Sequence, residues 1–292
     1  MRITEGMRYH NVLVDIARAQ ERVMKAEQQV SSGKKLAVPS DNPGATADIL
    51  RLHSENNEAE QYLRNLTFGR SRLELTDGVL DTIQRIVERA RTLGQLGFSD
   101  DGLATGYVTE VNSLRDQLIT ASNTTHAGRF IFGGSMTTTE PYVKNPDSSV
   151  TYNGNSEVMQ LQIGRATTVQ TQFAGDEVFT GSTDVFEVMN DLVTAMQSGD
   201  QDGMNQQVRM LEQYAENLSV VRSKVGGYLN FTTDIENGLA AAKLARAHEL
   251  TQEEAADLAV AISELSMSQN SLQATLAVGA RISQLTILDF LR

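Results

Sequence analysis

The chain has 292 residues, a net charge of −12, and neither cysteine nor tryptophan. The absence of cysteine excludes disulfide frameworks, cysteine-ligated zinc sites and thiol nucleophiles. The surplus of carboxylates disfavours nucleic acid and anionic membrane as partners. With no apolar run for a secretory signal or a membrane span, the sequence alone predicts a soluble protein that the general export route does not carry.

The N-terminal segment has an apolar stripe that predicts one amphipathic helix. Its members recur at steps of three and four, as on one face of a coiled-coil helix. Ser31-Ser32-Gly33 is expected to end this helix. The stripe consists of Tyr9, Leu13, Ile16, Ala19, Val23, Ala26 and Val30.

Two further helices are predicted before residue 129, because apolar residues recur at helical spacing and no proline interrupts segment 44–140. Asn42 as N-cap and Pro43 at the first helical position start the first of them, which frays near Gly94. The turn Asp100-Asp101-Gly102 leads into the next, which fades at Gly128.

Residues 129–182 change character and predict a small β-rich insert. Phe130-Ile131-Phe132 is β-like, and Val150-Thr151-Tyr152 meets the turn signal Asn153-Gly154. Alternating apolar residues follow, so a hairpin is expected around Asn153-Gly154.

Helices resume at Thr183, first a short one that ends at Ser198-Gly199 and then a long one. Gly226-Gly227 inside the long helix implies a packing reason or a break, because each glycine costs about 1 kcal/mol relative to alanine. Thr251-Gln252-Glu253-Glu254 matches a capping box and is expected to open the last helix. The stripe of that helix contains Leu258, Ile262, Leu265, Leu272, Leu276, Ile282, Leu285 and Leu288.

The sequence shows no constellation for catalysis. The histidines His10, His53, His126 and His248 lack metal-ligand spacing, and the acidic pairs at 100–101 and 253–254 are explained as helix-start residues that complement the macrodipole. We therefore expect no enzyme activity, no metal and no cofactor.

The two ends of the chain carry opposite charge. Residues 1–35 hold seven basic and four acidic side chains, net +3, and residues 251–292 hold two basic and five acidic, net −3. Opposite charge favours pairing of the ends, although exposed ion pairs contribute only about 0–1 kcal/mol each. Periodicity alone leaves two readings open: a self-contained helical bundle, or many copies that pack their stripes together.

Several motifs together resemble the smaller hook-filament junction proteins, or hook-associated proteins of type 3, of the flagellin superfamily. Flagellins share the Ser-Ser-Gly segment but usually lack the proline pair at 39 and 43. The matching segments are Met1-Arg2-Ile3-Thr4, Gln28 to Lys35 with Ser32 and Gly33, Pro39-Ser40-Asp41-Asn42-Pro43, Gly128-Arg129-Phe130-Ile131-Phe132-Gly133-Gly134, Glu140-Pro141-Tyr142, the set Arg222, Gly226 and Asn230, and Leu285 to Leu291.

The resemblance implies a mainly α protein with a small β insert: an elongated helical rod with terminal coiled-coil helices, as in flagellin. Residues 1–35 and 251–292 would form an inner coiled-coil domain, 36–128 and 183–250 a helical rod domain, and 129–182 an outer β-rich insert.

The implied function is that of a structural adapter between hook and filament, exported without a cleavable signal to the extracellular flagellum. Its implied partners are the larger hook-filament junction protein, flagellin, copies of itself, and a flagellar export chaperone at the C-terminal helix. Two alternatives remain at this point: a flagellin, and a cytoplasmic coiled-coil adaptor.

Overall fold

The computed structural model describes residues 5–36, 38–97, 104–181 and 183–290, and most of them are helical. The α-helices are α1 (Glu5–Ser32), α2 (Pro43–Leu96), α3 (Ala104–Ser122), α4 (Val185–Ser198), α5 (Gln201–Glu254) and α6 (Leu258–Phe290). The strands are β1 (Thr125–His126), β2 (Arg129–Phe130), β3 (Tyr142–Lys144), β4 (Val150–Tyr152), β5 (Gln160–Gln162) and β6 (Thr168–Gln170). A 3₁₀ turn, η1, covers Pro39–Asp41, and a π-helical turn, η2, covers Asp176–Thr180. The predicted class, mainly α with a small β insert, is confirmed.

The chain forms two compact units. The terminal unit contains residues 1–58 and 241–292, and the central unit contains residues 59–240. The long helices α2 and α5 contribute residues to both units. The predicted division into three assembly domains remains a prediction.

The start of α2 follows the local sequence signal. The Asn42 side-chain oxygen accepts a hydrogen bond from the Ala45 N–H at 3.1 Å, and Pro43 occupies the first helical position. The end of α1 also lies where predicted, because Gly33 has a φ of +68° and its N–H donates to the Gln29 carbonyl.

The start of α6 does not follow the prediction. The Thr251 hydroxyl donates to the Ala247 carbonyl at 2.8 Å inside α5, which continues to Glu254. Asp257 is the observed cap, since its carboxylate accepts from the amides of Ala259 at 2.9 Å and Val260 at 3.3 Å. The predicted capping box at Thr251 is therefore wrong, and Glu253-Glu254 ends a helix instead of starting one.

The corrected cap gives a direct test on the full chain. We expect Asp257→Ala to destabilise α6 by about 1 kcal/mol and to speed amide exchange at Ala259 and Val260. Thr251→Ala is the matched control and should leave those amides unchanged, because its hydroxyl satisfies no helix-start donor. Faster exchange in the Thr251 variant alone would restore the capping box.

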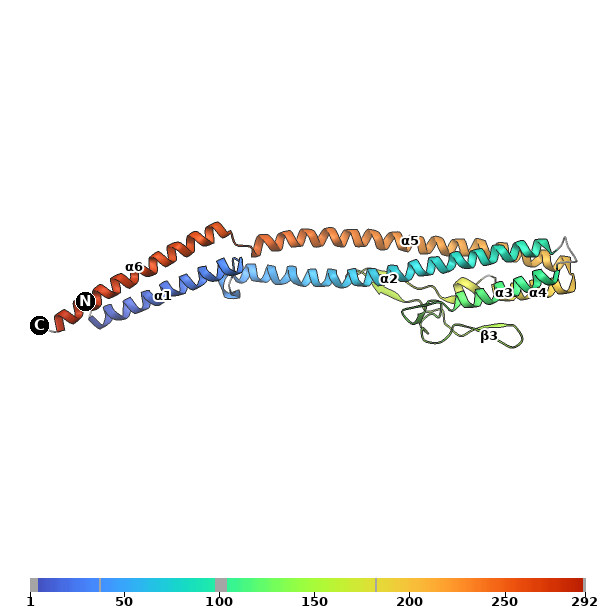
Figure 1. Ribbon diagram of the computed structural model, residues 1–292, viewed down its shortest axis with the longest axis horizontal. Coiled ribbons are helices and arrows are strands. Elements are labelled where there is room, and N and C mark those ends of the chain that lie inside the picture. Colours follow the sequence, from blue (N-terminus) through green and yellow to red (C-terminus); the bar gives the residue numbers. More distant parts are fainter. Residues whose placement is uncertain (1–4, 37, 98–103, 182, 291–292) are drawn as a thin grey trace. The chain divides into compact units, whose positions relative to one another are not determined.

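The central unit is built on α2 and α5, which run side by side (Figure 1). Arg70 pairs with Glu236 and Arg91 with Glu212, so the two helices are antiparallel. Between them and the shorter helices lies one apolar core of leucine, isoleucine, valine and methionine side chains. Representative members are Leu80, Ile83, Leu118, Leu192, Leu211 and Val225.

The insert between α3 and α4 contains three separate two-stranded antiparallel sheets. Aromatic side chains of the insert and of α4 pack together against the core, with neighbouring ring centroids 4.9–5.7 Å apart. This cluster consists of Phe132, Tyr142, Tyr152 and Phe179 of the insert and Phe186 of α4. The insert is thereby attached to the helical core through aromatic packing.

The strand pairing of the insert differs from the predicted one. β4 pairs with the preceding strand β3, antiparallel and with Val143 opposite Thr151. Segment 145–149 forms the turn between the two strands. Within that turn Ser148 has a φ of +69°, and the Asp147 carboxylate accepts from the Ser149 hydroxyl and amide. The predicted hairpin at Asn153-Gly154 is wrong, because the Asn153 N–H donates to the Pro141 carbonyl at 2.8 Å.

Four smaller expectations have different outcomes. Helix α3 ends at Ser122, six residues before Gly128, which instead joins Ala127 in the positive-φ turn of the β1–β2 hairpin. Only Phe130 of the β-like run 130–132 lies in a strand. Helix α5 passes unbroken through Gly226-Gly227, and a Cβ at either position would meet no described atom within 4 Å, so neither expected reason is found. The turn at 100–102 lies outside the described residues.

Candidate assembly surface

The terminal helices form an antiparallel pair along α1 and α6 (Figure 1). Small residues allow the close approach: Ala19, Ala26 and Ala261 are all buried. At Gly279 a Cβ atom would lie 3.0 Å from Val12 Cγ1, tighter than an ordinary contact. Most of the fully buried side chains of the pair are therefore small, and each of these buries little apolar area.

Both helices of this pair carry large apolar side chains that stay about half exposed in the described chain. Leu13 is 47% exposed on α1, and Leu276 is 46% exposed on α6. The other large exposed apolar residues on the two helices are Met7, Met24, Leu258, Val260, Ile262, Met267 and Val278. Exposed large apolar side chains are a common feature of protein–protein contact sites.

The structure places the predicted seam residues at three levels of burial. Val23 is buried between the helices, and Ile16, Val30, Leu265 and Leu272 are half-buried. Leu13, Leu258, Ile262 and Leu276 are exposed. The side chains of Ile282, Leu285 and Leu288 lie outside the described ones. Pairing of α1 with α6 thus buries only part of the predicted apolar stripes and leaves the rest exposed.

A short strand-like contact joins two segments of the terminal unit. One segment follows the end of α1, and the other follows the end of α5. The Lys35 N–H donates to the Glu254 carbonyl at 2.7 Å, and the Ala256 N–H donates to the Gly33 carbonyl at 2.8 Å. These two bonds frame an antiparallel bridge between Lys34 and Ala255. They supply partners for backbone groups that a helix end would otherwise leave unsatisfied.

Ionic contacts converge on Glu254 at this bridge. Its carboxylate lies 3.1 Å from Lys34 Nζ and 3.1 Å from His53 Nε2. Partial burial would raise the pKa of Glu254, but the hydrogen bonds from His53 and Lys34 outweigh it and hold the pKa below its ordinary value. These contacts stabilise the fold above the ordinary carboxyl pKa and lose that effect as the pH falls through the lowered one.

Sequence reasoning missed this cluster. Lys34, His53 and Glu254 are far apart in the sequence, and nothing local marks them as neighbours. The one signal in the sequence was the acidic pair 253–254, which by itself suggests a helix start.

The motif positions of the N-terminal segment have local structural roles. The Ser32 hydroxyl donates to the Gln28 carbonyl, and Gly33 takes the left-handed conformation that ends α1. Pro39 begins η1, and Asp41 accepts from Lys25 at 2.7 Å and from the Val38 amide. These contacts fix the loop between α1 and α2.

The remaining motif positions lie in the central unit. Arg222 on α5 contacts Asp77 at 3.2 Å and Asp81 at 3.1 Å on α2, and it also donates to Gln84 at 2.7 Å. Arg129 lies on β2. Gly226 and Asn230 follow Arg222 on α5, half-buried and exposed respectively. Arg222 therefore links α5 to α2 through ion pairs and a hydrogen bond.

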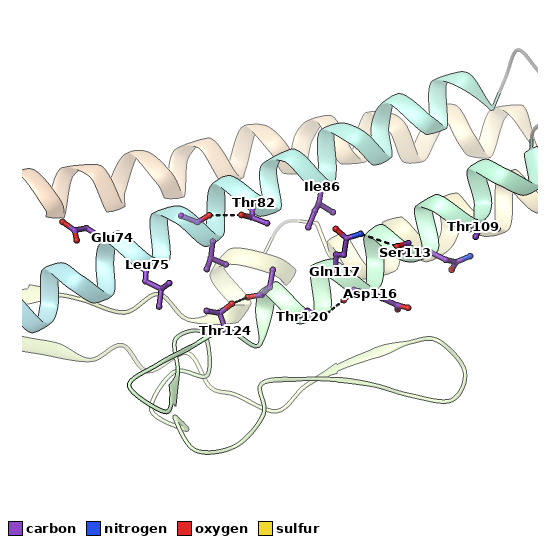
Figure 2. Close-up of a pocket in the computed structure, with 14 residues that line it drawn as sticks. Glu74, Leu75, Thr82, Ile86, Thr109, Ser113, Asp116, Gln117, Thr120 and Thr124 are labelled. Atoms are coloured by element: carbon purple, nitrogen blue, oxygen red, sulfur yellow. Dashed lines mark hydrogen bonds between the residues drawn. The ribbon is translucent and has the colours of Figure 1, made fainter.

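A surface groove of about 1,010 Å³ runs between α2 and α3 (Figure 2). Leu75, Val79 and Ile86 give it an apolar wall on the α2 side, and hydroxyl and amide side chains line the α3 side. Asp116 on its rim is paired with Lys144 at 2.6 Å. The described residues that line the groove include no histidine or lysine, and its two carboxylates are held in ion pairs, Glu74 with Arg70 and Asp116 with Lys144.

Neither a metal cluster nor a membrane span is found in the described part of the chain. No group of three or more histidine, aspartate or glutamate side chains among the described residues is arranged to hold a metal ion. None of the described helices is long and apolar enough to cross a membrane.

Comparison with known proteins agrees with the helical architecture. The family model for the bacterial flagellin N-terminal helical region matches residues 3–137. Flagellar hook-associated protein 3 of Escherichia coli (strain K12) is 24% identical over 303 residues, which covers 94% of this chain and 95% of that protein. The protein of the same name from Salmonella typhimurium (strain LT2) is 29% identical over 188 residues, or 63% of this chain and 58% of that one.

Solved structures show the same fold. The crystal structure of flagellar hook-associated protein 3 from Legionella pneumophila matches with a TM-score of 0.64 and 14% identity. The match covers 70% of this chain and 98% of that one.

The sequence matches support a flagellar structural protein that contains the helical region typical of bacterial flagellins. Within that class, the resemblance expected from the sequence is confirmed: the chain is a relative of flagellar hook-associated protein 3, the smaller hook-filament junction protein.

Proposed function

We propose that this chain is the structural adapter that joins the hook side of the flagellum to the filament, and that copies assemble through the outer faces of α1 and α6. The observation that carries the proposal is the set of exposed large apolar side chains on both terminal helices. Because these side chains are about half exposed, covering each one on assembly would contribute part of the roughly 1.5–3 kcal/mol that complete burial of a large apolar side chain provides.

The proposed place of the chain, between the hook side and the filament, suggests its assembly partners. Copies of the chain would pack their α1–α6 pairs side by side, with the larger hook-filament junction protein on one side and flagellin on the other. The names of its relatives, which associate them with the hook, support this placement.

The route to the assembly site is export as an unfolded chain through the flagellar type III channel, without a cleavable signal. A cytoplasmic export chaperone would cover the apolar face of α6 until then. An uncovered stripe of this size would otherwise promote aggregation in the cytoplasm.

Both alternatives from the sequence are less well supported. A flagellin would not explain the similarity to hook-associated protein 3 over nearly the whole chain. A cytoplasmic adaptor would not explain the flagellin-type helical region.

Deletion of the gene tests the proposal. We expect the mutant to build hooks without filaments and to release flagellin monomers into the medium, because the filament lacks its adapter. Complementation with the wild-type gene is the control. Normal filaments in the mutant, or intracellular retention of the protein in cells that make flagella, would contradict the proposed role.

A further inference from the structure

A buried arginine without a carboxylate partner lies where α2 meets the β1–β2 hairpin. The side chain of Arg72 is only 2% exposed. Its Nη2 donates to the Phe130 carbonyl at 3.4 Å, near the outer limit for a hydrogen bond, and its Nε is buried with no partner. Within the described residues no carboxylate forms an ion pair with it.

Further donor groups surround the same corner. Arg129 on β2 stands directly opposite His126 on β1, so both side chains project from one face of the hairpin. Ser71 Oγ and His126 Nε2 are 3.0 Å apart, and Nδ1 of that ring is buried without a partner. Burial lowers the pKa of Arg72, and the positive charge of Arg129 lowers it further.

The buried positive charge of Arg72 destabilises the fold unless an anion binds beside it. An arginine does not lose its proton in proteins, so it cannot escape burial by becoming neutral. Two guanidinium groups and an imidazole at one corner match the donor set that binds oxyanions. Arg129 is exposed, so the corner opens toward solvent on its side.

We propose that Arg72, Arg129 and His126 form an oxyanion-binding site. The oxyanion is either a carboxylate side chain of a second copy of this chain, which is rich in carboxylates, or free inorganic phosphate. Both present the same oxygen acceptors to the two guanidinium groups.

Phosphate titration of the full-length protein tests the site. We expect phosphate to raise the Tm above that in sodium chloride of equal ionic strength, and to shift the Nε–Hε NMR signals of Arg72 and Arg129 with one common Kd. The rise in Tm should be lost in Arg72→Met and reduced in Arg129→Gln. Arg64→Met is the matched control, an exposed arginine of the same helix bonded to Gln61, and should keep the full rise.

A second readout separates this site from a purely structural role of Arg72. Without phosphate, Arg72→Met should be at least as stable as the wild-type chain, because it removes an unpaired buried charge. The proposal would be overturned if Arg72→Met were less stable than the wild-type chain and phosphate did not raise the Tm of the wild-type chain. Unshifted arginine signals in the wild-type protein would overturn it by themselves, even if the methionine variant failed to fold.

Copy–copy association identifies the source of the anion. If a neighbouring carboxylate fills the site, phosphate competes with it and both phosphate and Arg72→Met lower association in sedimentation experiments. If free phosphate fills the site, association stays unchanged while the Tm response persists.

Discussion

Replacement of Leu276 by aspartate should abolish assembly of the protein into flagella while leaving the isolated chain folded. Leu276 is 46% exposed on the outer face of α6, so the isolated chain can hydrate a carboxylate there. In an assembled seam the same charge would be desolvated without a partner, which costs several kcal/mol per subunit. Motility on soft agar and the protein content of sheared flagella give the measurement.

Val220→Asp is a matched control for this variant. Val220 is 57% exposed on α5, in the central unit, and is also a large aliphatic residue on a long helix. We expect it to leave motility unchanged, because it lies outside the proposed seam. Export of the Leu276 variant should stay normal, since an unfolded chain passes the channel. Normal motility of the Leu276 variant would remove α6 from the assembly seam.

Limited proteolysis of the purified monomer should cut before residue 44 and after residue 250 and leave a resistant middle. The α1–α6 pair buries mainly small residues, and about 25 cal/mol per Å² of buried apolar area must offset about 1–2 kcal/mol per ordered residue. The two helices comprise 28 and 33 residues, so the entropy cost of ordering them is large. We therefore expect them to open readily in solution and to become stable only when neighbours cover their outer faces.

A cross-linked variant controls for this explanation. The natural chain has no cysteine, so Val12→Cys with Gly279→Cys introduces a single pair at a close approach of α1 and α6. Once oxidised, this variant should resist cleavage at both ends, because the link restricts opening of the pair. Equal protection of the ends in the unlinked wild-type monomer would contradict coupled folding and favour a self-contained helical bundle.

Local sequence signals predicted the features whose partners lie within a few residues. Asn42 and Pro43 start α2 because the cap accepts from an amide three positions along. Gly33 ends α1 because it tolerates positive φ. The stripes of three- and four-residue steps predicted the terminal helices, since helical geometry alone places those side chains on one face.

Tertiary contacts decided the features where local signals competed. Glu254 had the sequence context of a capping box, but Lys34 and His53 bind its carboxylate from distant segments, and Asp257 caps α6 instead. Asn153-Gly154 had the composition of a hairpin turn, but the Pro141 carbonyl takes the Asn153 amide.

The buried position of Arg72 beside Arg129 likewise arises only when α2 packs against the hairpin. The sequence by itself thus determined helix faces and several helix ends, which depend on bonds within one or two turns. Only the folded chain decided which polar group each charge meets, because those partners come from segments far apart in the sequence.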